Sequence, residues 1–183
     1  GDAASGMTEK ETIVITSTDG TEKTYCVIDD NATTVATGAV LAADSDIGSQ
    51  VAGDDLVGAI AVAINLTGSA STQNAFLVQL KAAIEHANGH NGKITVSAVP
   101  TEANGAQAIT LTQAVGGVTG NVSITDDISQ TTLAGFTSGT DVLANSVAVA
   151  INTTGTAATQ NDFLVQLKAA IESANGHNGK ILV

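Results

Sequence analysis

The alternation of apolar and polar residues near the start of the chain predicts a β-hairpin. Apolar positions alternate with polar ones over residues 12–16 and again over 25–27, on the two sides of Asp19 and Gly20. A period of two residues places one set of side chains on one face of a strand. Glycine adopts positive φ at little cost, so Asp19 and Gly20 are expected to form the turn.

A different spacing, with apolar residues three or four positions apart, predicts an amphipathic helix over residues 73–88. Thr72 is the expected N-cap, because its hydroxyl can accept a hydrogen bond from a free N–H of the first turn. Asn88 and Gly89 are expected to end the helix, because both residues tolerate the left-handed conformation. The apolar stripe consists of Phe76, Leu80, Ala83, Ile84 and Ala87.

Short apolar runs on both sides of this helix predict further strands. The β-branched run at 57–65 precedes the helix and is expected to be a buried strand. Residues 29–55 are rich in Ala, Asp and Gly, which predicts a long ordered loop with a short apolar patch near Val40. Three strands are expected after the helix, at residues 93–99, 107–115 and 121–127.

The chain then repeats itself. Residues 148–183 match residues 61–96 at an offset of 87, with 30 identities in 36 positions. The matching span predicts a second strand–helix–strand segment, with its helix over 160–175 and the same apolar stripe around Phe163. Self-similarity at a fixed offset is typical of repeated structural units, so we interpret the repeat as a packing module.

These patterns predict an α+β fold with antiparallel-rich sheets, each packed against one amphipathic helix. One full β-β-β-α-β-β-β unit is followed by a partial β-α-β repeat. The expected boundaries are an N-terminal arm at 1–11, the full module at 12–137 and the partial second repeat at 138–183.

The partial repeat is expected to have an open sheet edge, which native proteins usually cover. Two hypotheses remain. The half-module docks on the first unit of its own chain, or a neighbouring chain lends a strand by β-strand addition. The segment from Gly1 to Ser17 is the expected donor in the second case, because it combines a loose arm with an alternating strand.

The amino-acid composition argues against several classes of binding protein. The chain of 183 residues is 43% hydrophobic but only 2% aromatic, so it has few rings on which sugars or bases could stack. Its net charge is -12 and its six cationic residues are all lysines, which argues against binding to nucleic acid or to anionic membranes. No apolar stretch reaches the roughly 18 residues of a membrane span. Cys26 is the only cysteine and is expected to be a small buried hydrophobe.

An acidic loop is the weak candidate for a calcium site. Oxygen-rich loops bind calcium, but the EF-hand pattern fails because Ser49 stands where that pattern requires glycine. A solvated acidic loop is the plainer interpretation, and Asp126 and Asp127 could join such a site only with weaker support. The candidate ligands in the loop are Asp44, Asp46, Asp54 and Asp55.

His86 and His90 have the spacing of zinc ligands on one face of a helix. The internal copy keeps the second histidine as His177 but has Ser173 in place of the first. His90 and His177 are therefore expected to bond free carbonyls at the helix ends rather than a metal.

The sequence lacks several common catalytic and nucleotide-binding motifs. The chain has no G-x-S-x-G elbow, no P-loop and no dinucleotide-binding glycine motif after a strand. The glycine-rich stretch at 116–121 joins two expected strands and opens no helix, so it lacks the helix N-terminus that would hold a phosphate. No enzymatic activity, catalytic residue or cofactor is expected.

Three strings in the chain, "LKAAIEHANGHNGKITV", "ITLTQAVGGVTGNVSIT" and "FTSGTD", resemble repeat modules in structural proteins of tailed bacteriophages, particularly marine ones. In that group the module often opens with a strand and hairpin like "ETIVITSTDGTEKTY", which is present here. The resemblance covers Thr12 to Thr137 as a full module and Ala148 to Val183 as a partial one. It implies no catalytic residues and a role in the virion, as a fibre, adhesin or surface decoration domain.

The sequence therefore predicts a non-enzymatic virion structural protein, of the capsid-surface decoration or tail-fibre type, that acts through self-assembly. The expected location is the virion surface or the extracellular space. The expected partners are copies of itself, in a homo-oligomer, and other virion or filament proteins, without nucleic acid and without membrane insertion. The alternatives are a cell-surface adhesin or extracellular filament subunit, and a calcium-binding interaction module or small enzyme.

Overall fold

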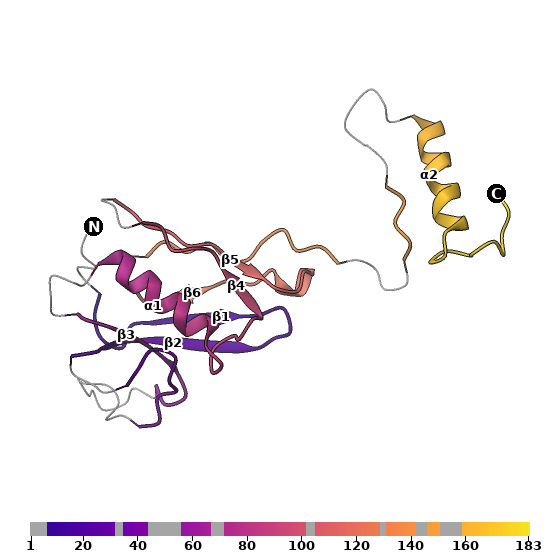
Figure 1. Ribbon diagram of the computed structural model, residues 1–183. Helices are drawn as coiled ribbons and strands as arrows, with labels where there is room; N and C mark the ends of the chain where they lie inside the picture. The colour runs from indigo at the N-terminus through magenta and orange to yellow at the C-terminus, as the bar shows by residue number, and fades with distance from the viewer. Residues whose placement is uncertain are drawn as a thin grey trace. The chain divides into compact units, whose positions relative to one another are not determined.

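The computed structural model divides the chain into two compact units, unit 1 (Gly1–Asp141) and unit 2 (Val142–Val183). The described residues form an α+β fold with a mixed four-stranded sheet, a two-stranded sheet and two α-helices (Figure 1). This confirms the predicted class. The structure describes residues 7–31, 35–43, 56–66, 72–101, 105–128, 131–141, 146–150 and 159–183.

The predicted hairpin is present and begins unit 1. Strand β1 (Thr12–Thr16) pairs antiparallel with β2 (Glu22–Asp29), and Ile13 lies opposite Tyr25. Gly20 has a φ of 81°, which is the left-handed region that favours glycine. The period-two pattern places alternate side chains of β1 in the core, as the burial of Ile13 and Ile15 confirms.

The main sheet has the strand order β3-β2-β1-β6. Strand β3 (Ile60–Ile64) is buried along its whole length, as predicted, and pairs in parallel with β2. The short strand β6 (Thr125–Asp126) pairs antiparallel with β1. Because β1 has a partner on each side, residues 12–16 belong to the chain's own sheet, and the hypothesis that they are donated to a neighbour is wrong.

The second sheet joins β4 (Ile94–Val96) and β5 (Leu111–Gln113) as an antiparallel pair. A 3₁₀ turn, η2 (Val118–Gly120), follows before β6. The three strands predicted after the helix therefore exist but are shorter than the apolar runs that predicted them.

Helix α1 (Gln73–Glu85) lies against one face of the main sheet (Figure 1). Thr72 is its N-cap, as predicted, and accepts a hydrogen bond from the N–H of Ala75 at 3.1 Å. Four of the five predicted stripe residues are buried, namely Phe76, Leu80, Ala83 and Ile84.

The helix ends three residues earlier than predicted, at Glu85, and Ala87 is exposed beyond its end. The chain turns under the last carbonyls, and the N–H groups of His90 and Asn91 bond the carbonyl of Ile84 at 2.9 and 3.3 Å. Gly89 passes so close that a Cβ there would lie 2.1 Å from the carbonyl oxygen of Ala83. The prediction that Gly89 supplies a left-handed cap was wrong, because its role is close approach.

The core of unit 1 lies on both faces of the main sheet. On the α1 face, isoleucines and valines of all three long strands pack against the helix stripe and against Ile94 and Val96 of β4. On the other face, Cys26 packs with Ile28, Leu41 and three alanines. Cys26 is fully buried, as predicted, and burial raises its pKa to about 12.

Unit 2 contains helix α2 (Gln160–Glu172), which has the bounds of α1 after the offset of 87. Its N-cap is Thr159, with Asp162 completing a capping box. Residues 146–150 and 173–183 form no strand, so the two strands predicted beside this helix are not formed in those described segments. A strand needs a partner with which to exchange backbone hydrogen bonds, and the 36-residue copy carries no counterpart of the first hairpin.

Candidate functional site

A buried hydrogen-bonded pair fixes the helix end to the hairpin in unit 1. The Tyr25 hydroxyl donates to Nδ1 of His90 at 2.6 Å, and Nε2 of His90 lies 3.3 Å from the carbonyl oxygen of Thr21. A carbonyl can only accept, so we assign the ring proton to Nε2. Burial lowers the pKa of His90 and raises that of Tyr25, so both groups are neutral.

This pair rules His90 out as a zinc ligand, because both of its ring nitrogens already have protein partners. His86 is exposed, and its Nδ1 accepts from the N–H of Asn88 at 3.2 Å. As predicted, His90 and His177 bond free helix carbonyls, but they do so through their backbone N–H groups: His90 bonds Ile84 at 2.9 Å, and the exposed His177 bonds Ile171 at 2.7 Å. The ring of His90 contacts the hairpin instead.

An exposed ion pair connects the same turn to the chain after the helix. Nζ of Lys93 lies 2.8 Å from a carboxylate oxygen of Asp19 and donates to the Thr21 hydroxyl at 2.6 Å. This lysine holds the pKa of Asp19 well below its usual range. The hairpin turn is therefore joined to the segment that follows α1 by polar contacts as well as by packing.

The candidate calcium ligands Asp44, Asp46, Asp54 and Asp55 lie outside the described residues. Asp126 and Asp127, the weaker candidates, have partners within unit 1: Asp126 accepts from the Thr131 hydroxyl and Asp127 from the N–H of Thr12. Within the described ranges, no group of three or more His, Cys, Asp or Glu side chains could hold a metal ion.

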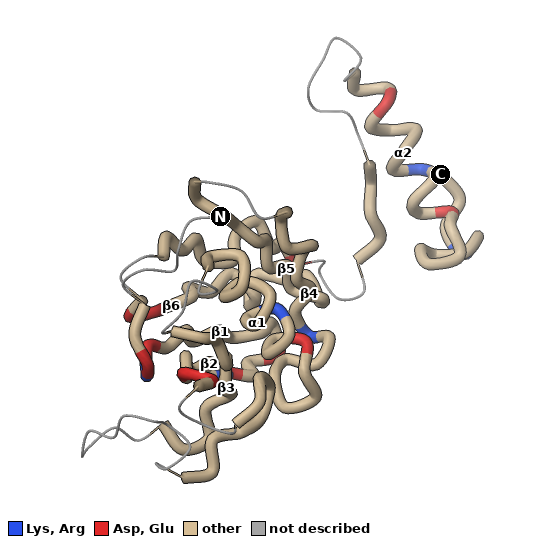
Figure 2. The backbone as a smooth tube through the Cα atoms, turned by 60° about the vertical axis from the view of Figure 1, so that its left-hand side comes forward, with Lys and Arg blue, Asp and Glu red and all other residues tan. Residues whose placement is uncertain are grey.

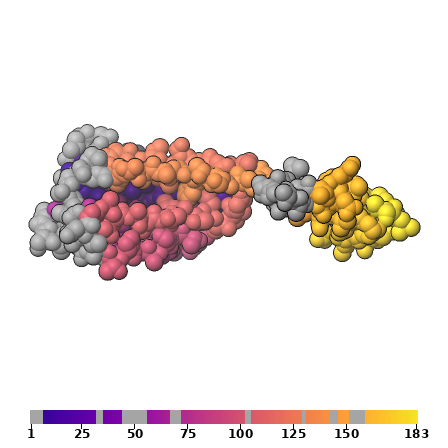
Figure 3. Space-filling view, turned by 90° about the horizontal axis from the view of Figure 1, so that it is seen from above, coloured from indigo at the N-terminus to yellow at the C-terminus, as the bar shows by residue number. Residues whose placement is uncertain are grey.

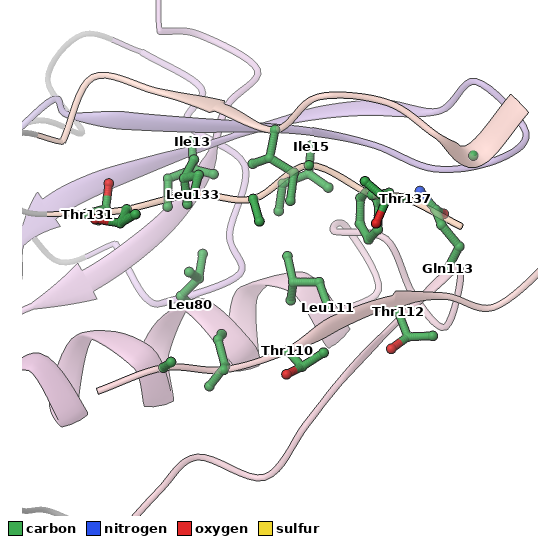
Figure 4. A pocket seen from close by; sticks show the side chains of 18 of the residues that line it. Ile13, Ile15, Leu80, Thr110, Leu111, Thr112, Gln113, Thr131, Leu133 and Thr137 are labelled. Carbon is green, nitrogen blue, oxygen red and sulfur yellow. The ribbon is translucent and has the colours of Figure 1, made fainter. Parts of the chain in front are cut away.

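Unit 1 has a groove of about 990 Å³ between the main sheet and the α1–β5 layer. Ile13 and Ile15 of β1 are among the residues that line it. In the space-filling view, the orange 131–141 segment forms one wall of a hollow whose floor has the indigo colour of the N-terminal part of the chain (Figure 3). In the close-up, Leu133 points into the groove from the sheet side, and Leu80 and Leu111 point into it from the other side (Figure 4).

None of the residues that line this groove is charged. The charged positions marked along the backbone in Figure 2 all belong to other parts of the described chain. Threonine hydroxyls and glutamine amides supply most of the polar atoms. In a chain with a net charge of -12, the groove is therefore an uncharged surface.

Hydrogen bonds hold both walls of the groove in place. On the β5 side, the Gln113 amide accepts from the N–H of Thr18 at 3.0 Å and donates to the carbonyl of Thr16 at 2.9 Å. On the other side, the Asn121 amide accepts from the N–H of Gly139 at 2.7 Å and donates to its carbonyl at 2.9 Å. The groove is thus built into unit 1 by side chains that bridge distant segments.

The second uncharged surface is the stripe of α2. Phe163 is 41% exposed, whereas its counterpart Phe76 is 4% exposed. Leu167 and Ile171 are only partly buried, and Ala170 is the one stripe residue of α2 that is buried. The stripe that is buried in unit 1 is therefore only partly buried in unit 2, where Phe163 is exposed.

Sequence reasoning identified the stripe but missed the groove. The groove walls come from residues 106–117 and 131–139, which show no helical period. One signal could have indicated them: residues 103–125 and 128–140 contain no Asp, Glu, Lys or His.

Comparison with protein-family models, with characterised sequences and with solved structures finds no match to this chain. In the described parts of the chain, neither helix is long and apolar enough to cross a membrane.

Proposed function

We propose that this chain is a non-enzymatic structural protein of a virion, of the capsid-surface decoration or tail-fibre type, that acts through self-assembly. One observation carries the proposal: a stripe of identical side chains is buried on α1 but only partly buried on α2, where Phe163 is 41% exposed. Burial of one large apolar side chain contributes about 1.5–3 kcal/mol, so a stripe that is incompletely buried favours association with another surface.

The distribution of charge supports the same function. The net charge of -12 keeps free subunits apart and soluble, whereas the α2 stripe and the groove carry no charge that contact would desolvate. Association is therefore directed to the uncharged surfaces. The resemblance of three sequence strings to tailed-phage modules supports a virion as the setting.

The proposal includes the arrangement of the repeat. The element order of unit 1, with three strands before α1 and three after it, supports its interpretation as the full module. We regard residues 138–183 as a partial module that gains its missing partners only on assembly. Its strands would then form in the assembled state, when a neighbouring chain supplies groups with which to pair.

Electron microscopy of the native assembly tests this function, supported by sedimentation of the purified chain. A regular array on a capsid or a tail fibre is the expected result. A pilus-like filament on a cell surface would select the adhesin or filament alternative. A chain that sediments as a monomer up to millimolar concentration contradicts self-assembly.

A further inference from the structure

We propose that α2 of one copy of this chain docks into the uncharged groove of unit 1 of a second copy, beside α1. This inference rests on the self-assembly proposed above and names the two surfaces that meet. The donor surface is the stripe of Phe163, Leu167, Ala170 and Ile171. The acceptor is the groove that Ile13 and Ile15 help to line.

The first argument is that unit 1 already accepts this stripe. Phe76, Leu80, Ala83 and Ile84 of α1 pack against the same face of the main sheet on which the groove lies. The α2 stripe presents the same side chains at the same spacing. A sheet face of isoleucines and valines that packs with one such stripe is chemically suited to a second one.

The second argument is that the groove continues the α1 interface. Ile13, Ile15, Phe76 and Leu80 belong to the core cluster of unit 1 and also line the groove. The groove is therefore an unfilled extension of the surface on which α1 packs. Its volume of about 990 Å³ admits several large side chains from one helix face.

The third argument is that the contact would bury no unpaired charge. The groove lining is uncharged, and so is the α2 stripe. Three charged residues of α2 have partners outside the stripe: Lys168 pairs with Glu172, and Asp162 bonds the N-cap Thr159. An uncharged surface therefore meets an uncharged surface, without the desolvation cost that disfavours buried ions.

The geometry of the contact also determines the kind of assembly. Donor and acceptor are different surfaces, so each copy can donate α2 to one neighbour and accept α2 from another. Such a head-to-tail contact closes into a ring or continues as a filament. Both outcomes fit a virion component, and neither requires a sheet edge to pair.

Disulfide crosslinking between two single-cysteine preparations tests the contact. Cys26 is fully buried, so each introduced cysteine is the one accessible thiol. One preparation carries Thr137→Cys on the groove wall, and the other carries Gln166→Cys beside the α2 stripe. The control replaces Thr137→Cys by Thr95→Cys, an exposed threonine of β4 that does not line the groove.

Mild oxidation of a one-to-one mixture should link Thr137→Cys chains to Gln166→Cys chains about 100-fold faster than the Thr95→Cys control. A thiol pair held in contact has an effective concentration of about 1 mM, which is about 100 times a bulk concentration of about 10 μM. Adding Phe163→Ala and Leu167→Ala to the α2 partner should abolish this gain. Val165→Ala should leave it intact, because Val165 is on the outward face, like its exposed counterpart Val78.

Each other outcome overturns a stated part of the proposal. A chain with both Thr137→Cys and Gln166→Cys that forms an internal disulfide at a concentration-independent rate shows docking within one chain. Rapid homodimers of Gln166→Cys alone show that α2 pairs with α2. Assembly by sedimentation without crosslinking above the control removes the groove contact but keeps self-assembly, whereas absence of assembly removes both.

Discussion

Helices α1 and α2 have nearly the same amino-acid sequence but lie in different surroundings, α1 in unit 1 and α2 in unit 2. Their bounds, N-caps and C-terminal turns coincide after the offset of 87. Gly89 and Gly176 approach the preceding helix carbonyls at nearly the same distance, 2.1 and 2.2 Å from an ideal Cβ. The lysine of each helix pairs with a glutamate four residues later and also bonds the carbonyl of Val96 or Val183.

The two copies differ in everything that depends on distant residues. His90 is buried against Tyr25 of the hairpin, whereas His177 is exposed. The β4 strand has β5 as its partner, whereas residues 181–183 form no strand. The comparison teaches that about 25 residues suffice to specify the helix and its turns, but that burial and strand pairing need the rest of the module.

Loss of the stripe phenylalanine should affect the two copies most unequally. Phe76→Ala should lower the free energy of unfolding by about 3–5 kcal/mol, because it leaves a cavity in the core of unit 1. Phe163→Ala should change it by less than about 0.5 kcal/mol in dilute protein, because that ring is exposed. Urea denaturation of both variants below the assembly concentration measures the difference. Equal losses would mean that the α2 stripe is packed as tightly as that of α1.

Removal of the Tyr25 hydroxyl tests the hydrogen bond to His90, which has no counterpart at His177 in the second copy. Tyr25→Phe leaves Nδ1 of His90 buried without a donor, which should destabilise unit 1 by about 1–3 kcal/mol. His177→Ala is the matched change in the second copy and should cost less than about 0.5 kcal/mol, because the ring is exposed. Chemical denaturation of the two variants against the parent gives both values. If Tyr25→Phe leaves the free energy of unfolding unchanged, the Tyr25–His90 hydrogen bond contributes no net stability.

The buried imidazole should also make unit 1 sensitive to mild acid. Burial lowers the pKa of His90 in the folded state, so the unfolded chain binds a proton first, near pH 6.5. The free energy of unfolding therefore has its full value above that pH. It falls as the pH drops below it, because the unfolded chain binds the proton more readily than the folded one. Carboxylates titrate below about pH 5, so the range between about pH 5 and pH 6.5 reports on histidine rather than on carboxylates.

Urea midpoints between pH 8 and pH 5 measure this slope. His90→Gln should flatten the dependence in this window whatever its effect on stability at pH 8. His177→Gln should keep the slope of the parent, because the buried ring is still present. A His90→Gln variant with the parent's slope would assign the acid sensitivity to another group.

The local patterns predicted the hairpin and both helices because their information lies within a few residues. The period-two run around Ile13 and the helical stripe around Phe76 are both buried as predicted. The helix end was predicted wrongly because backbone N–H groups of His90 and Asn91, rather than a glycine cap, bond the last carbonyls. Residue type does not predict such backbone bonds.

Long-range features were the ones that the sequence could not predict. The pairing of β1 with β6 joins Ile13 to Asp126, and no pattern in either strand identifies its partner. That pairing is why β1 belongs to the chain's own sheet and is not available as a donor strand. The groove likewise requires Gln113 to bond the backbone of Thr16 and Thr18, so this wall exists only after two distant segments have met.

The smallest expected effect concerns the first turn, where the two helices differ at one position. Asp162 accepts a hydrogen bond from the N–H of Thr159 at 3.0 Å and completes a capping box, whereas α1 has Ala75 at this position. Ala75→Asp should give α1 the same box and raise the melting temperature of unit 1 by about 1–3 °C at pH 7. An acidic residue there also interacts favourably with the helix dipole.

Calorimetry at pH 7 and pH 3 checks this transfer of the cap. The bonds from Thr159 lower the pKa of Asp162, so such a carboxylate stabilises the fold above its unfolded pKa and loses that effect as pH falls through its folded pKa. The gain from Ala75→Asp should therefore shrink at pH 3. Ala75→Asn is the matched control, because it offers an acceptor without a charge and should show no such pH dependence. If Ala75→Asp lowers the melting temperature at pH 7, the half-buried site in unit 1 does not tolerate the carboxylate, and the first turns of the two copies are not interchangeable.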